Sequence, residues 1–211
     1  MFPRIIRFLP LLLATSVLVA CKDGDSGKTA PPAAASAPAN SPAAAGTAGT
    51  VAASAPAGNI YEAAAKGTGF TVGNMMAVRQ IYVFFDPQCP HCGHLWEAAK
   101  PLANQVKMVW MPVGFIAPRS TTQGAALLAA GDPAAAMNAH EQSLLSKQGG
   151  LIPPDNLPAD LTEKVKANTK IWQQLGGEAV PLVVFKNPGS GEPGKFAGSL
   201  DTASLKKLLG L

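Results

Sequence analysis

The sequence is short of cysteine, and this shortage limits what its thiols can do. It contains three cysteines in 211 residues, and only Cys89 and Cys92 lie beyond the first 21 positions. Two cysteines cannot build a disulfide framework. A closed zinc site needs four ligands, and the chain has no second C-x-x-C pair and no distant pair of histidines to complete one. Metal capture by this pair is kept as an alternative, mainly for transient copper or zinc.

The chain is also short of arginine and of long apolar runs. Beyond residue 7 the only arginines are Arg79 and Arg119, and the lysines are scattered. Nucleic-acid binding needs a clustered basic face, so no nucleic-acid partner is expected. The apolar run from Ile5 to Ala20 is too short, and too interrupted by proline and serine, to cross a bilayer comfortably.

Residues 1–21 resemble the signal of a bacterial lipoprotein. Arg4 and Arg7 precede the apolar run, which is typical of a secretory signal. The run ends in LVAC, which is similar to a lipobox, and this resemblance implies cleavage before Cys21 and a lipid on its thiol. Lys22 follows instead of aspartate, so inner-membrane retention is not indicated and the outer membrane is favoured. An ordinary secretory signal with a chance cysteine is the alternative; in both cases the protein is exported to a compartment where disulfides persist.

The next segment, residues 22–58, predicts a disordered tether. It is rich in alanine, proline and serine, has no aromatic residue, and has Val51 as its only large aliphatic residue. Such a segment buries too little apolar surface to offset its ordering entropy. Residues 59–211 remain as one domain, which the tether would let work away from a membrane surface.

This remaining part is expected to be an α/β domain. The segment 79–85, RQIYVFF, is β-branched, aromatic and apolar nearly throughout, which predicts a central strand buried on both faces. Pro101 is expected to kink or end the helix expected over residues 90–105. Periodicity alone supports an α/β fold with a helical insertion. The other expected strands are 69–72, 106–113, 181–186 and 195–198, and the expected helices are 60–66, 90–105, 121–130, 133–147, 161–175 and 202–209.

The sequence Cys89-Pro90-His91-Cys92 fits redox chemistry better than a structural staple. A disulfide across this spacing closes almost no chain, so it gains little loop entropy. Cys89 would lie at the N-terminus of a helix, where free N–H groups and the helix dipole stabilise a thiolate. Cys92, one turn further, could then attack a mixed disulfide on Cys89. Pro90 would fix the turn, and His91 would add a dipole or partial positive charge beside the thiolate. The nearby titratable or aromatic residues are expected to be structural or surface residues: Asp86, His94, Trp96, Trp110, His140 and Trp172.

The stretch VFFDPQCPHCGHLW, which contains this pair, resembles the active-site region of the DsbC/DsbG group of periplasmic thiol:disulfide interchange proteins, and is closest to its DsbG branch. The similarity continues through GAALLAAGDPAAA, QQLGG and VPLVVF, and so covers most of residues 75–211. It implies a thioredoxin-like fold with a helical insertion at about 118–176. It also implies that Val180-Pro181 is a cis-proline loop whose Val180 backbone pairs with a substrate strand. No cofactor is implied beyond the redox-active pair itself.

The chain departs from this group in two ways. A low-complexity tether stands where the group has an N-terminal dimerisation domain, so a monomer is expected. The Pro-His pair between the cysteines, and Val180 before the proline, resemble the DsbA oxidases instead. We therefore expect an oxidase-like enzyme that acts on cysteines of exported proteins and exchanges electrons with a DsbB-like or DsbD-like membrane partner. The alternatives are an isomerase or reductase kept reduced by a membrane donor, and a metal-capturing lipoprotein.

Overall fold

The structure, a computed structural model, describes residues 59–211. The predicted signal and lipobox at 1–21 and the predicted tether at 22–58 lie outside the described residues. No helix within 59–211 is long and apolar enough to span a bilayer. The strands of this part are β1 (Phe70–Gly73), β2 (Arg79–Phe85), β3 (Val106–Pro112), β4 (Leu182–Lys186) and β5 (Pro193–Ala197), and its helices are α1 (Ile60–Ala65), α2 (Pro90–Ala99), the short 3₁₀ helix η1 (Lys100–Leu102), α3 (Ser120–Ala129), α4 (Pro133–Leu145), α5 (Ala159–Gln174) and α6 (Thr202–Leu209).

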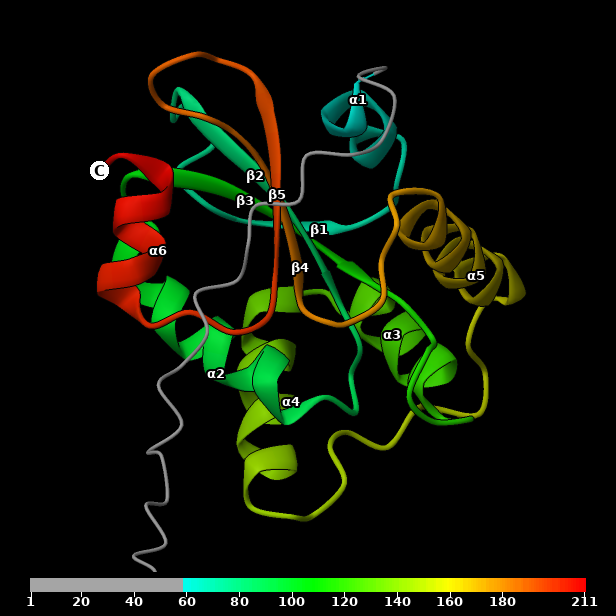
Figure 1. Ribbon diagram of the computed structural model, residues 1–211. Helices are drawn as coiled ribbons and strands as arrows, with labels where there is room; N and C mark the ends of the chain where they lie inside the picture. The colour runs from blue at the N-terminus through cyan, green and yellow to red at the C-terminus, as the bar shows by residue number, and fades with distance from the viewer. Residues whose placement is uncertain (1–58) are drawn as a thin grey trace, which may run out of the picture. The chain divides into compact units, whose positions relative to one another are not determined.

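The strands form one sheet in the order β1-β3-β2-β4-β5, with β2 at its centre (Figure 1). β2 and β3 run parallel, as expected for strands joined through the crossover helix α2, while the other neighbours are antiparallel. Every residue from Ile81 to Phe85 is buried. The predicted central strand with two covered faces is confirmed.

Alternate side chains of β2 meet helices on opposite faces of the sheet. Tyr82 meets Tyr61 of α1 edge to face, with ring centroids 5.0 Å apart. Its face is therefore the one that α1 covers, and α1 in turn contacts α5. Phe85 points to the other face, where it contacts Trp110 of β3 at 5.8 Å, and Trp110 contacts Trp96 of α2 at 4.9 Å. Helices α2 and α6, which contact one another, cover this second face.

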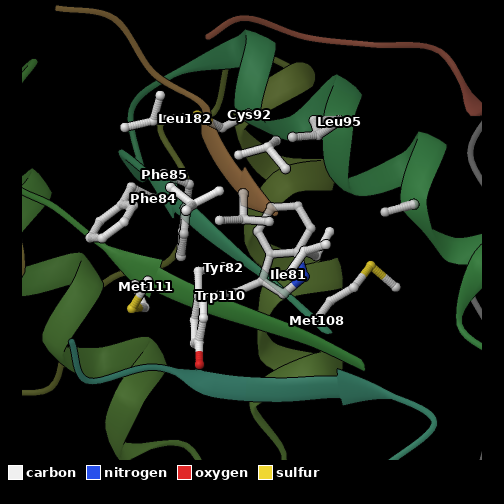
Figure 2. Close-up of a cluster of buried hydrophobic side chains, with 14 of the residues drawn as sticks. Ile81, Tyr82, Phe84, Phe85, Cys92, Leu95, Met108, Trp110, Met111 and Leu182 are labelled. Atoms are coloured by element: carbon white, nitrogen blue, oxygen red, sulfur yellow. The ribbon is translucent and has the colours of Figure 1, made fainter. Parts of the chain in front are cut away.

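Helix α2 rests on the hydrophobic core of this second face. Figure 2 shows Cys92 and Leu95 of α2 over the buried side chains of the sheet, which include Ile81 and Trp110. Both α2 residues are almost fully buried, with exposed fractions of 0% and 1%. The start of α2 is thus held firmly against the sheet.

Helices α3, α4 and α5 lie between β3 and β4, in the segment where the resemblance implies a helical insertion. α3 contacts both α4 and α5, while α4 also contacts α2. The insertion therefore reaches back to the helix that follows β2, and side chains from α4 lie near the two cysteines.

The predicted helix over 90–105 is too long. α2 ends at Ala99, and Pro101 lies in the short 3₁₀ helix η1 that follows it. Proline has no N–H to donate to the turn before it, and its ring clashes with that turn, so the α-helix cannot continue. The prediction that Pro101 ends or kinks the helix is confirmed. The other predicted ends lie within two residues of those observed.

Candidate active site at the start of helix α2

Local geometry places Cys89 at the N-terminus of α2. Cys89 is the N-cap residue, its N–H donates to the carbonyl of Asp86 at 3.0 Å, and Pro90 is the first helical residue. Proline is well suited to this position because its missing N–H would have no helical partner there. The Cys89 sulfur therefore lies beside the free N–H groups of the first helical turn.

The surroundings of Cys89 favour its thiolate. They lower the pKa of Cys89 from 9.0 to about 6, chiefly through the hydrogen bond from the Cys92 thiol. Burial opposes this shift, whereas the backbone N–H groups of Cys92 and His91 and the charge of His91 add to it in smaller amounts. With a pKa of about 6, roughly nine-tenths of Cys89 is thiolate at pH 7. The tuning that the sequence assigned to His91 is a minor contribution here.

Cys92 has the opposite character. Its side chain is fully buried, and burial raises its pKa well above 9.0, with the hydrogen bond to Cys89 as the second cause. Both cysteines are thiols in this structure. The pair thus combines one sulfur that ionises readily with one that holds its proton, as nucleophilic attack followed by resolution requires.

The loop before β4 faces this pair. The peptide bond between Val180 and Pro181 is cis, and the Cys89 Sγ lies 3.5 Å from the Val180 carbonyl oxygen. Trp172 of α5 fixes the loop, since its indole N–H donates to the carbonyl of Ala179 at 3.3 Å. The structure thus brings Cys89 and Val180 together from segments far apart in sequence. Pairing of the Val180 backbone with a substrate strand stays a prediction.

Asp86, expected to be structural or at the surface, is a buried anchor. Its carboxylate accepts hydrogen bonds from the N–H of Gln88, Phe115 and Ile116 and from the Ser120 hydroxyl, at 2.7–2.8 Å. Both carboxylate oxygens are therefore occupied. Asp86 ties the turn before Cys89 to the loop that follows β3.

His140 of α4 is also structural. Its Nε2 lies 2.6 Å from the carbonyl of Pro87, and its Nδ1 accepts from the N–H of Leu151 at 3.1 Å. Because Nδ1 accepts, Nε2 carries the hydrogen and donates to Pro87. Burial lowers the pKa of His140, so the ring is neutral near pH 7. Gln88 and Gln123, joined side chain to side chain at 2.6 Å, brace the same corner of the site.

The histidines of α2 do not form a metal site with the cysteines. His91 and His94 are exposed, with ring centroids 6.1 Å apart, whereas Cys89 and Cys92 are buried. No group of three or more histidine, cysteine, aspartate or glutamate side chains within 59–211 is arranged to hold a metal ion.

One buried residue beside the pair escaped the sequence analysis. Glu141 of α4 is fully buried against α2, where a Cβ atom on Gly93 would collide with its Oε2. The sequence carried one weak signal of this burial. Glu141 follows the buried Met137 by four residues, which places both on one face of α4.

The architecture and the site together define a class. A central β2-α2-β3 unit, a β-hairpin entered through a cis-proline, and a CPHC pair at the start of α2 make a thioredoxin-like fold with a dithiol site. A periplasmic thioredoxin-like protein from Salmonella enterica serovar Typhimurium matches it with a TM-score of 0.58 over 72% of this chain and 95% of that one, at 16% identity. At that identity the likeness shows the fold alone.

Two curated relatives narrow the class, and both are thiol:disulfide interchange proteins DsbG. The Pseudomonas aeruginosa protein is 33% identical over 140 residues, which cover 65% of this chain and 54% of the relative. The Escherichia coli protein is 35% identical over 111 residues, which cover 50% and 42%. The chain thus spans about half the length of these relatives, and no family model matches it. The predicted resemblance to the DsbC/DsbG group and the predicted thioredoxin-like fold are confirmed.

Proposed function

We propose that this protein is a thiol:disulfide oxidoreductase that acts on cysteines of exported proteins. The observation that carries the proposal is the asymmetry of the pair. Cys89 has a pKa of about 6 at the start of α2, and fully buried Cys92 has a pKa well above 9.0. The similarity to DsbG proteins supports the same reaction. Cys89 is the nucleophile, Cys92 is the resolving thiol, and no further cofactor is needed.

Oxidation of a substrate takes two exchanges. A substrate thiolate attacks the Cys89 sulfur of the Cys89–Cys92 disulfide, a mixed disulfide forms, and Cys92 leaves with the electron pair and gains a proton. A second substrate thiolate then attacks the substrate sulfur of the mixed disulfide, and Cys89 leaves as a thiolate. The substrate loses two electrons to the cysteine pair. The low pKa of Cys89 makes it a good leaving group in the second step.

In this proposal the loop before β4, which contains Val180 and Pro181, orients the substrate. Val180 offers backbone groups next to the Cys89 sulfur, and its carbonyl already lies 3.5 Å from that sulfur. A substrate segment that pairs with Val180 would bring its own sulfur to Cys89. Pro181 keeps the loop turned toward α2, and Pro90 fixes the turn between the cysteines.

The groups at the sulfurs support a proposal for the direction of electron flow. A stable Cys89 thiolate favours the reduced pair, so the disulfide form is an oxidant. Pro90-His91 and Val180 also resemble the DsbA oxidases. We therefore place the protein on the oxidising side. The similarity to DsbG favours an isomerase or reductase, kept reduced by a DsbD-like donor, as the second candidate.

We further propose a periplasmic location with a lipid anchor on Cys21 in the outer membrane. The support is the sequence of residues 1–21, with its basic start, short apolar run and LVAC ending. A DsbB-like membrane protein would reoxidise the pair if it works as an oxidase.

The reaction can be tested with a peptide that carries two cysteines. The disulfide form of the protein should oxidise the reduced peptide, with one peptide disulfide formed for each Cys89–Cys92 pair reduced. Cys89→Ser should abolish this exchange, while Cys92→Ser, given glutathione disulfide as the oxidant, should stop at a mixed disulfide on Cys89. An exchange that survives Cys89→Ser would refute the assignment of the nucleophile.

A further inference from the structure

Glu141 is a buried acid without a structural partner. Its side chain is fully buried, and neither carboxylate oxygen has a hydrogen-bond partner in the part of the chain that the structure describes. A buried polar group without a partner is rare in proteins, and a buried unpaired charge costs several kcal/mol. Asp86, which is also fully buried and precedes Cys89 by three residues, shows the contrast, since hydrogen bonds occupy both of its oxygens.

The position of Glu141 points to Cys92. Its carboxyl group packs on Gly93, the residue directly after Cys92, and the missing side chain of Gly93 leaves the room that it fills. Its charge adds to the effects of burial and of Cys89 in raising the pKa of Cys92, and the charge of Cys89 adds to burial in raising the pKa of Glu141. The other acidic group that influences Glu141 is Glu97, on the exposed side of α2.

The remaining titratable groups nearby are engaged elsewhere. The ring of His140, the neighbour of Glu141 on α4, is held by Pro87 and Leu151. His91 and His94 of α2 are exposed. Among the described residues, Glu141 is thus the buried group next to Cys92 that is free to gain or lose a proton.

Cys92 needs such a group. Its sulfur is fully buried, yet every exchange cycle requires it to gain or lose a proton. Burial, then the charge of Cys89, then that of Glu97 raise the pKa of Glu141 from 4.5 to about 8. An acid with a pKa near the working pH is suited to pass a proton in either direction.

We propose that the carboxyl group of Glu141 is the proton donor and acceptor for the Cys92 sulfur. The proposal rests on the proposed thiol–disulfide exchange and adds a third residue to it. When a substrate thiolate attacks Cys89 in the disulfide, Cys92 leaves with the electron pair and Glu141 gives it a proton. In the reverse step Cys92 returns the proton to the Glu141 carboxylate, attacks Cys89, and expels the substrate sulfur as a thiolate with the electron pair. No hydrogen bond joins the Glu141 carboxyl group to the Cys92 sulfur in the described structure. In this proposal the proton therefore passes after rotation of the Glu141 side chain, or through one bridging water.

Glu141→Gln keeps the shape of the side chain and removes its proton chemistry. Glu97→Gln is the matched control, because it makes the same change on the exposed side of α2. The full chain, reduced and mixed with glutathione disulfide, first forms a mixed disulfide on Cys89 and then closes the Cys89–Cys92 bond. Rapid acid quenching followed by mass spectrometry gives the rate of each step.

The expected result is specific to the closing step. Glu141→Gln should slow closure about a hundredfold near pH 7 and remove its pH dependence around pH 8, while the first step stays as fast as in the wild type. Glu97→Gln should leave the first step unchanged and closure close to its wild-type rate, with only a small downward shift of the pH profile, because the charge of Glu97 is the smallest cause of the raised pKa of Glu141. Closure in Glu141→Gln with the wild-type rate and pH profile would overturn the proposal. A wild-type protein that forms no Cys89–Cys92 bond would instead overturn the proposed function.

A second measurement needs no folded variant. Infrared difference spectra between the disulfide and dithiol forms of the wild type should show a protonated carboxyl band that changes with the redox state near pH 7. Partial unfolding of Glu141→Gln would leave this test intact. A redox difference spectrum without any carboxyl band between pH 6 and about 9 would contradict the proposal.

Discussion

Replacement of Cys92 tests why Cys89 ionises so readily. The pKa of Cys89 is lowered from 9.0 to about 6, and the hydrogen bond from the Cys92 thiol is the largest cause. Cys92→Ala removes this donor, whereas Cys92→Ser keeps a hydroxyl donor at the same place. The two variants differ by one oxygen atom, so their comparison isolates the hydrogen bond from the change in packing.

The size of the expected effect follows from the remaining groups. The backbone N–H groups of Cys92 and His91 and the charge of His91 still stabilise the thiolate in the alanine variant. These groups are each smaller causes than burial, which opposes the thiolate, so the pKa of Cys89 should rise by more than about one unit in Cys92→Ala. The thiolate fraction at pH 7 would fall from roughly nine-tenths to below about half. Cys92→Ser should stay close to the wild type.

Ultraviolet absorbance of the thiolate, titrated against pH, measures this pKa directly, and the pH dependence of alkylation by iodoacetamide checks it. His91→Ser is a useful further control, because the charge of His91 is the smallest cause and its loss should move the pKa far less. An unchanged pKa in Cys92→Ala would contradict this role of the Cys92 thiol. It would mean that the helix N-terminus and the charge of His91 are enough to stabilise the thiolate.

Three further predictions concern stability, anchoring and assembly. Burial is the main cause that raises the pKa of Glu141 from 4.5 to about 8, so the folded protein should lose up to about 4 kcal/mol of stability as the pH rises between these values. Glu141→Gln should remove this loss. Urea unfolding of both proteins at about pH 5 and pH 9 measures it, and an equal pH dependence in the two proteins would contradict the prediction. Cys21→Ser should release the protein from the membrane fraction or block its maturation, and an unchanged membrane distribution would count against the lipobox. Residues 59–211 alone should sediment as a monomer, and a stable dimer at micromolar concentration would reopen the isomerase hypothesis.

Sequence patterns predicted the parts of the fold that local chemistry determines. The segment from Ile81 to Phe85 is apolar without polar alternation, which predicts a strand covered on both faces. Cys89 at the start of α2 follows from Pro90, which fits the first position of a helix and breaks later ones. Pro101 marks the end of the same helix, because proline breaks a helix beyond its first turn.

Contacts between distant segments could not be predicted in the same way. The cis bond before Pro181 and its approach to Cys89 came from the family resemblance, because proline alone gives a cis bond only rarely. Asp86 accepts three of its four hydrogen bonds from distant residues, because the loop after β3 and the start of α3 fold over it. Glu141 lies in a helical segment of mixed polarity, and its burial depends on how α4 packs on Gly93. The nearby Met137 places Glu141 on the buried face of α4, but it does not determine how α4 packs on α2.

The reduction potential of the Cys89–Cys92 pair tests whether the pair acts as an oxidant in thiol–disulfide exchange. The full chain would be equilibrated with glutathione buffers of graded ratio, and the fraction of the pair in the disulfide form would be read by alkylation and mass spectrometry. We predict a reversible two-electron transition with a potential nearer to about −120 mV than to the roughly −270 mV of thioredoxin. A potential below about −200 mV would contradict the oxidising direction, and a pair that never equilibrates with glutathione would contradict thiol–disulfide exchange altogether.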